Sequence, residues 1–62
     1  MFAVRKCHGA VGWVWWSKNG DWTKQREDIR EMLRDDAEAL QKEFQNLNPG
    51  WDDYYIDDVE NI

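Results

Sequence analysis

The spacing of apolar residues changes once along this chain of 62 residues, and that change limits which elements can form. From Phe2 to His8, Phe2 and Val4 share one face, as in a β-strand. From Val11 to Ser17 a second strand is predicted, and its two faces are both apolar: Val11, Trp13 and Trp15 lie on one and Val14 and Trp16 on the other. From about Trp22 to Leu47, apolar residues recur at every third or fourth position, as on one face of a helix. The sequence therefore predicts two strands followed by one long helix.

The predicted helix carries one continuous apolar stripe. Its members are Ile29, Leu33, Ala37, Leu40, Phe44 and Leu47, with Met32 alongside. Asp21 or Thr23 is expected to cap its start, because a side-chain oxygen there accepts a backbone N–H. Asn48-Pro49-Gly50 is expected to end it, because proline cannot continue the hydrogen-bond ladder. Before the helix, Asn19-Gly20 predicts a tight turn.

A third strand is predicted from Tyr54 to Val59, after the helix. A helix that joins the second and third strands leaves them running parallel, so the third strand can pair antiparallel with the first or parallel with the second. We favour the first arrangement, because antiparallel pairs are commoner and tolerate one solvated face. We thus expect one α+β domain over residues 1–62. It has a three-stranded, mostly antiparallel sheet in β-β-α-β order, strand order 2-1-3, with one long helix packed on one face.

Chain length limits the ways in which such a fold can be stabilised. A domain of this size buries only about 60% of the surface that its unfolded chain exposes. The single cysteine, Cys7, excludes an internal disulfide. Aromatic residues offer the alternative, since each buried ring removes about 150–250 Å² from water. No apolar run approaches the ~20 residues that cross a bilayer, and no signal peptide is visible, so we expect a cytoplasmic protein with no membrane partner.

Charge is divided between the two parts of the chain. Residues 1–34 contain seven Lys/Arg and four Asp/Glu, a net charge of +3, whereas residues 35–62 contain one Lys and nine Asp/Glu, a net charge of −8. Such segregation bears on association rather than on fold, and an acidic surface favours a basic partner over duplex DNA or anionic lipid.

The acidic end of the chain supplies the candidate partner-binding residues. Carboxylates spaced along a strand resemble a phosphate backbone, and tyrosine is frequent at binding hot spots. The candidates are Asp52, Asp53, Tyr54, Tyr55, Asp57, Asp58 and Glu60, with Asp35, Asp36 and Glu38 as a second patch on the helix. The alternative is an acidic sheet edge that only keeps the protein soluble.

No residue pattern predicts catalysis, a metal site or a cofactor. Cys7 and His8 fall on opposite faces of the first strand, and the chain has no further Cys or His to complete a zinc site. The Asp52-Asp53 and Asp57-Asp58 pairs lack the alternation and the glycine of a calcium loop. One helix on a small sheet leaves little volume for a substrate cleft, so paired carboxylates are not expected to act as acid and base.

The short, acidic, aromatic-rich chain, its β-β-α-β order and its DDYYIDDVE segment resemble the small proteins that phages use against host machinery. Among these it is most similar to the anti-CRISPR proteins, several of which present an acidic surface where DNA would bind. The resemblance implies a non-enzymatic inhibitor that acts as a DNA mimic. Its partner would be a basic, nucleic-acid-binding host protein, above all a CRISPR effector subunit, with no direct contact to nucleic acid.

Two alternatives use the first two strands instead. Trp13, Trp15 and Trp16 lie near Arg5, Lys6 and Lys18, and aromatic rings flanked by cations on a sheet are typical of modules that stack single-stranded bases. The same tryptophans could instead be buried in a homodimer, as in an antitoxin-like adaptor. The sequence leaves monomer and homodimer both open.

Overall fold

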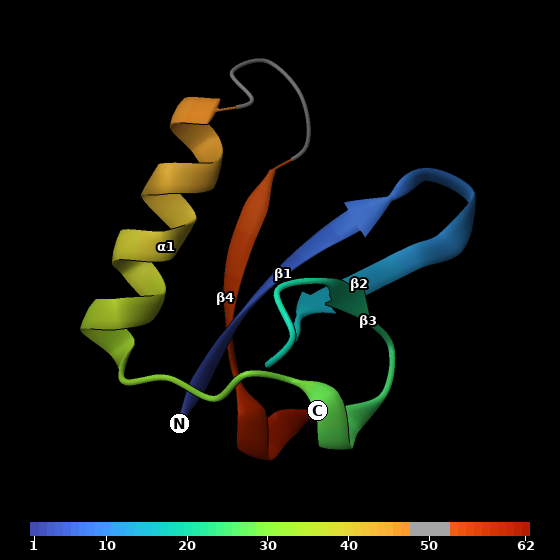
Figure 1. Cartoon of the computed structure of the whole chain (residues 1–62), viewed down its shortest axis with the longest axis horizontal. Helices are drawn as coiled ribbons and strands as arrows, with labels where there is room; N and C mark the ends of the chain where they lie inside the picture. The colour runs from blue at the N-terminus through green and yellow to red at the C-terminus, as the bar shows by residue number, and fades with distance from the viewer. Residues whose placement is uncertain (48–52) are drawn as a thin grey trace.

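The computed structural model describes residues 1–47 and 53–62, and it shows one α-helix packed against an antiparallel sheet of four strands (Figure 1). The strands are β1 (Phe2–His8), β2 (Gly12–Trp16), β3 (Trp22–Thr23) and β4 (Tyr54–Asp58). The helix α1 spans Arg34–Leu47, and three short 3-10 turns are η1 (Gly9–Val11), η2 (Arg26–Asp28) and η3 (Val59–Asn61). The predicted α+β class is confirmed.

The strand order is β3-β2-β1-β4, and every neighbouring pair is antiparallel. β1 lies between β2 and β4, which is the order predicted for the first, second and C-terminal strands. The predicted number of three strands was wrong, because β3 adds a fourth at the outer edge of β2. The Asn19-Gly20 turn that leads to β3 forms as predicted. Gly20 donates to the Ser17 carbonyl at 3.2 Å and has a φ of 79°, which glycine adopts without a Cβ clash.

The helix begins at Arg34, so its predicted start near Trp22 was wrong. Residues 22–33 instead form β3, η2 and an extended segment, in which Ile29 bridges to Ser17 and Met32 bridges to Phe2. Two residues three apart share one side of a helix but lie on opposite sides of an extended chain. Ile29 and Met32 therefore point to opposite sides of an extended chain.

The extended segment before α1 contributes side chains to two separate cores. Ile29 packs with Ala3 and Val59 on one face of the sheet, whereas Met32 packs with Val4 on the other. Leu33, which the predicted stripe placed next to Ile29 on the buried face of the helix, is 64% exposed. The middle of the stripe forms as predicted, because Ala37 is buried and Leu40 and Phe44 pack against the core, whereas Leu47 at its end is 69% exposed.

The main core lies between α1 and the sheet. It contains buried Val4, Met32, Ala37 and Tyr54, and half-buried Trp16, Trp22 and Phe44 close it at one side. The ring of Phe44 lies 5.0 Å from that of Trp16 and 5.3 Å from those of Trp22 and Tyr54, centroid to centroid. Aromatic packing thus supplies the stabilisation that a chain without disulfides needs.

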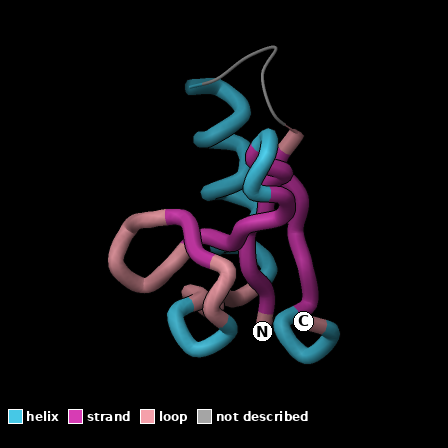
Figure 2. Tube along the Cα trace, turned by 90° about the vertical axis from the view of Figure 1, so that its right-hand side faces the viewer, coloured by secondary structure: helices cyan, strands magenta, loops and turns pink. Residues whose placement is uncertain are grey.

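The two faces of the sheet are covered unequally. α1 packs on β1 and β4, and Figure 2 shows η2 and η3 at the end of the sheet near both chain termini. On the face opposite α1, only a small second core of Ala3, Ile29 and Val59, with half-buried Trp15, is closed. We refer to the rest of that side, around Arg5, Cys7, Trp13 and Tyr55, as the open face.

Replacing Ile29 by alanine should lower the free energy of unfolding by about 2–5 kcal/mol, because it empties a side-chain site that is 1% exposed. Leu33→Ala is the matched control, and it should change stability by less than about 0.5 kcal/mol because Leu33 already faces water. Urea denaturation measures both values. Similar losses for the two variants would favour the long helix over the extended segment.

Candidate functional site

The structure divides the predicted acidic residues between the two ends of β4. Asp53 precedes the strand, whereas Asp58 ends it and Glu60 follows in η3. Phe2 pairs with Asp58 on one side and bridges to Met32 on the other. Since neighbouring strands are about 4.8 Å apart, Met32 and Asp58 lie within about 10 Å of each other.

The start of α1 lies at this same end of the molecule, at the bottom of Figure 1. Part of each predicted acidic patch, Asp35 and Asp36 from one and Asp58 and Glu60 from the other, therefore lies at one end of the fold. Asp35, Asp36 and Glu60 are exposed, and the Asp58 side chain accepts a hydrogen bond from the Glu60 backbone N–H at 3.1 Å.

Three further acids that were not among the sequence-based candidates join this end. Ile29 packs against Val59, which places η2 beside η3. We define the acidic end as the charged residues of 26–36 and 58–60. It contains seven acids and three arginines: Glu27, Asp28, Glu31, Asp35, Asp36, Asp58 and Glu60, with Arg26, Arg30 and Arg34.

The acidic end has a net charge of −4, from seven acids and three arginines, and its carboxylates form no ion pair with a residue that the structure describes. Among the residues that the structure describes, ion pairs shorter than 4.0 Å join Arg34 to Glu38, at 3.3 Å, and Arg5 to Asp57, at 3.4 Å. Neither carboxylate belongs to the acidic end. Its seven acids therefore present their charge to solvent or to a partner.

Asp57 has a structural role beneath the open face. One carboxylate oxygen lies 3.4 Å from Arg5 Nε, and the other accepts a hydrogen bond from Trp15 Nε1 at 3.1 Å. Arg5 Nε is buried and makes no aligned hydrogen bond to a described residue, so the ion pair with Asp57 is what balances its charge. Asp57 is thus engaged inside the protein.

The guanidinium of Arg5 also lies against two exposed rings. Its Cζ is 4.3 Å from the centre of the Trp13 ring and 5.5 Å from that of Tyr55. The two rings, both 41% exposed, pack edge to face with centroids 5.7 Å apart. A cation held against aromatic faces is attracted by about 0.5–2 kcal/mol, so these contacts help to hold the three side chains together.

The remaining predicted residues have separate positions. Tyr54 is 4% exposed, and its ring stacks on Phe44 in the core, so it serves the fold. The hydroxyl of Tyr55 donates to Asp53 at 3.4 Å, at the end of β4 away from the acidic end. Glu38 pairs with Arg34 along α1. Asp52 lies outside the described residues.

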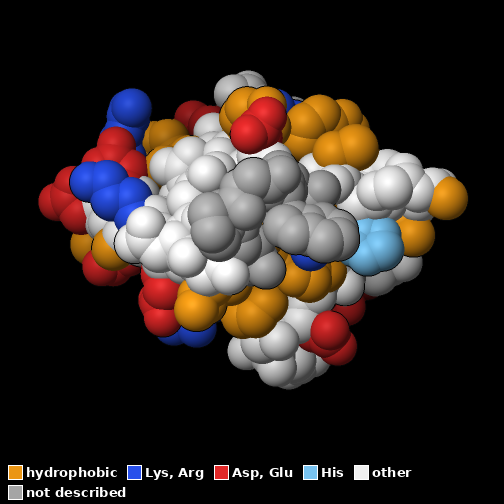
Figure 3. All heavy atoms as spheres, turned by 90° about the horizontal axis from the view of Figure 1, so that it is seen from above, with side chains coloured by type: hydrophobic (Ala, Val, Ile, Leu, Met, Phe, Trp, Pro, Cys, Tyr) orange, Lys and Arg blue, Asp and Glu red, His pale blue; other side chains and the backbone are white. Residues whose placement is uncertain are grey.

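The tryptophans of the β1–β2 hairpin do not form one surface. The register pairs Trp15 with Arg5 on the open face and Trp16 with Trp22 on the face of α1. Lys6 points to the same side as Trp22, with its Nζ 4.5 Å from the ring centre. Among the described tryptophans, Trp13 is thus the one left widely exposed. Figure 3 shows hydrophobic side chains at the surface of the hairpin end and charged ones gathered toward α1.

Further structural features bear on the sequence-based expectations. Within residues 1–47 and 53–62, no three His, Cys, Asp or Glu side chains gather as a metal site would require. The helix in that part of the chain is neither long nor apolar enough to span a bilayer. No protein-family model, no curated protein and no solved structure matches this chain. Evidence on its function thus comes from its own geometry and charge.

Asp57→Ala should lower the free energy of unfolding by about 1–3 kcal/mol, because it leaves buried Arg5 Nε without its counter-charge and Trp15 Nε1 without its acceptor. Asp53→Ala removes the same side chain from an exposed position and should change stability by less than about 0.5 kcal/mol. Chemical denaturation followed by circular dichroism measures both. If Asp57→Ala were as stable as Asp53→Ala, the ion pair would have no structural role.

Proposed function

We propose that this protein is a non-enzymatic inhibitor that binds a basic, nucleic-acid-binding host protein through its acidic end and so excludes nucleic acid from that surface. A CRISPR effector subunit is the partner class that the resemblance to anti-CRISPR proteins favours. The observation that carries the proposal is the convergence of seven acids from η2, the start of α1 and η3 on one end of a small sheet.

Rigidity supports this role for the acidic end. Backbone hydrogen bonds tie two of its segments to the start of the chain: Phe2 and Met32 exchange two, each of 2.7 Å, and Val59 N–H donates to the Met1 carbonyl at 2.9 Å. Carboxylates on segments held in this way need little ordering when a partner binds, which lowers the entropic cost of association. A fixed array of negative charge also steers a basic partner and speeds encounter at low salt.

The helix start is compatible with a high density of acids. Asp35 and Asp36 occupy the first turn of α1, where the helix dipole favours negative charge. The fold can therefore carry these two carboxylates, exposed and close together, without destabilising the helix that presents them. A small domain can therefore tolerate a high density of negative charge at this surface.

The triple variant Glu31→Gln, Asp35→Asn, Glu60→Gln should weaken binding to the partner by about tenfold or more, because it removes three exposed charges from the acidic end. The matched control is Asp21→Asn, Glu43→Gln, Asp53→Asn, which removes three exposed charges elsewhere and should leave binding within about twofold. Both variants have the same net charge, so only the position of the change differs.

The measurement is competition with DNA. Purified CRISPR effector complexes and other basic nucleic-acid-binding proteins are mixed with labelled DNA and increasing amounts of the wild-type chain or either variant. The proposal expects wild type and control to displace DNA from at least one of these proteins, and the acidic-end variant to fail. It would be contradicted if wild type displaced DNA from none of them, or if both variants lost activity equally.

A second candidate is suggested by the open face, where Trp13 and Tyr55 are exposed on either side of Arg5. Rings in this arrangement can stack single-stranded bases. Asp53 and Asp57 lie on the same side of the sheet and oppose a phosphate backbone, which is why we place this function second.

This second function has its own test in tryptophan fluorescence. If it is correct, a single-stranded oligonucleotide at low salt quenches the fluorescence, and Trp13→Ala weakens binding by about tenfold, since a stacked base contributes about 1–3 kcal/mol. Val11→Ala, at another exposed apolar position of the hairpin, is the control and should have no effect. Absence of quenching in the wild-type protein would exclude the function.

A further inference from the structure

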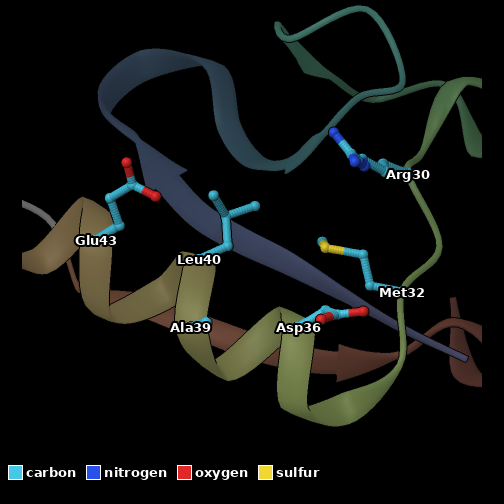
Figure 4. A pocket seen from close by; sticks show the side chains of 6 residues that line it. All are labelled: Arg30, Met32, Asp36, Ala39, Leu40 and Glu43. Carbon is cyan, nitrogen blue, oxygen red and sulfur yellow. The ribbon is translucent and has the colours of Figure 1, made fainter.

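A pocket of about 390 Å³ lies beside α1, on the side away from β4 (Figure 4). Its helix wall is formed by Asp36, Ala39, Leu40 and Glu43, and its opposite wall by Arg30 and Met32 from the extended segment before α1. The volume lies in the range typical of small-molecule sites. The pocket exists because the chain stays extended up to Leu33, which holds that segment apart from the helix that follows it.

The floor and the walls of the pocket differ in chemistry. Met32 is buried and Leu40 packs on the main core, so both belong to rigid structure and offer apolar contact. Ala39 is exposed, and its small side chain leaves the space open above Leu40. An apolar group of a ligand would therefore lie against Met32 and Leu40.

The charged side chains stand on opposite walls. Asp36 and Glu43 are seven residues apart on α1, which puts them on one side of the helix and about 10 Å apart along its axis. Arg30 approaches from the other wall, and Figure 4 shows its guanidinium directed toward the pocket. None of the three forms an ion pair within 4.0 Å with a residue that the structure describes.

This arrangement matches a ligand that is charged at both ends and apolar between them. We propose that the pocket binds a short apolar peptide with free termini: its carboxylate at Arg30, its ammonium group at Glu43, and its side chains on Met32 and Leu40. The inference does not depend on the function proposed above, which concerns a protein partner at the acidic end. Arg30 and Asp36 belong both to the acidic end and to the lining of the pocket.

The dipeptide leucyl-leucine and three capped forms of it test the proposal. Titration of the ¹⁵N-labelled protein should give saturable amide shifts in residues 30–32 and 39–43 with the free dipeptide. An N-acetyl cap or a C-terminal amide should each weaken binding about tenfold, because each removes one charge-assisted contact. The dipeptide with both caps, which also represents an internal segment of a protein partner, should bind most weakly.

Variants assign each end of the ligand to its wall. Arg30→Gln should make the dipeptides with a free and with an amidated C-terminus bind with equal affinity, while an N-acetyl cap should still weaken binding. Glu43→Gln should reduce the difference in affinity between the free dipeptide and its N-acetylated form. Ala39→Trp should fill the pocket and abolish binding, whereas Gln45→Trp, at an exposed position on the opposite side of α1, should leave binding unchanged. Thermal denaturation by circular dichroism checks that both tryptophan variants fold.

Three results would overturn the proposal. The first is the absence of saturable shifts with the free dipeptide up to its solubility limit. The second is equal binding of all four dipeptides, which would reduce the pocket to non-specific apolar contact. The third is unchanged binding by folded Ala39→Trp, which would place the ligand elsewhere.

Discussion

β1 is the strand on which the rest of this structure depends. It pairs with β2 on one side and β4 on the other, and its first residues also bridge to Met32. Its alternate side chains supply both cores, because Val4 packs under α1 and Ala3 packs under Ile29 and Val59. Val4 and Ala3 are both 0% exposed. In a chain of 62 residues with no internal disulfide, one central strand thus connects elements that are far apart in sequence.

The sequence was sufficient to predict the elements that repeat a simple period. Alternation located β1, β2 and β4, the preference for antiparallel pairing placed β1 between the other two, and the Asn19-Gly20 turn was evident from its residues. The start of the helix was not predictable in the same way. Ile29 and Met32 satisfy a helical stripe by their spacing of three, yet they fill two different cores from an extended chain. Tertiary packing on both sides of the sheet decided between these two geometries.

The same segment explains why only part of the candidate site could be predicted. Asp35, Asp36, Asp58 and Glu60 were evident from charge alone, but Glu27, Asp28 and Glu31 join them only because residues 24–33 cross the end of the sheet instead of continuing the helix. Asp57 shows the opposite case. It belongs to an acidic stretch in sequence, and the sheet turns it toward Arg5 and Trp15, where it stabilises the open face. The pocket beside α1 likewise has no signature in sequence, since its two walls come from residues on either side of the helix start.

The central claim is that one end of this molecule is built to meet a basic surface, and chemical-shift mapping with an arginine-rich peptide tests it most directly. Such a peptide stands in for the nucleic-acid-binding groove of the partner. The account predicts that amide shifts concentrate in residues 26–36 and 58–60, weaken steeply with added salt, and leave the β1–β2 hairpin unchanged. Shifts centred on Trp13 and Tyr55, or spread evenly over the molecule, would contradict it.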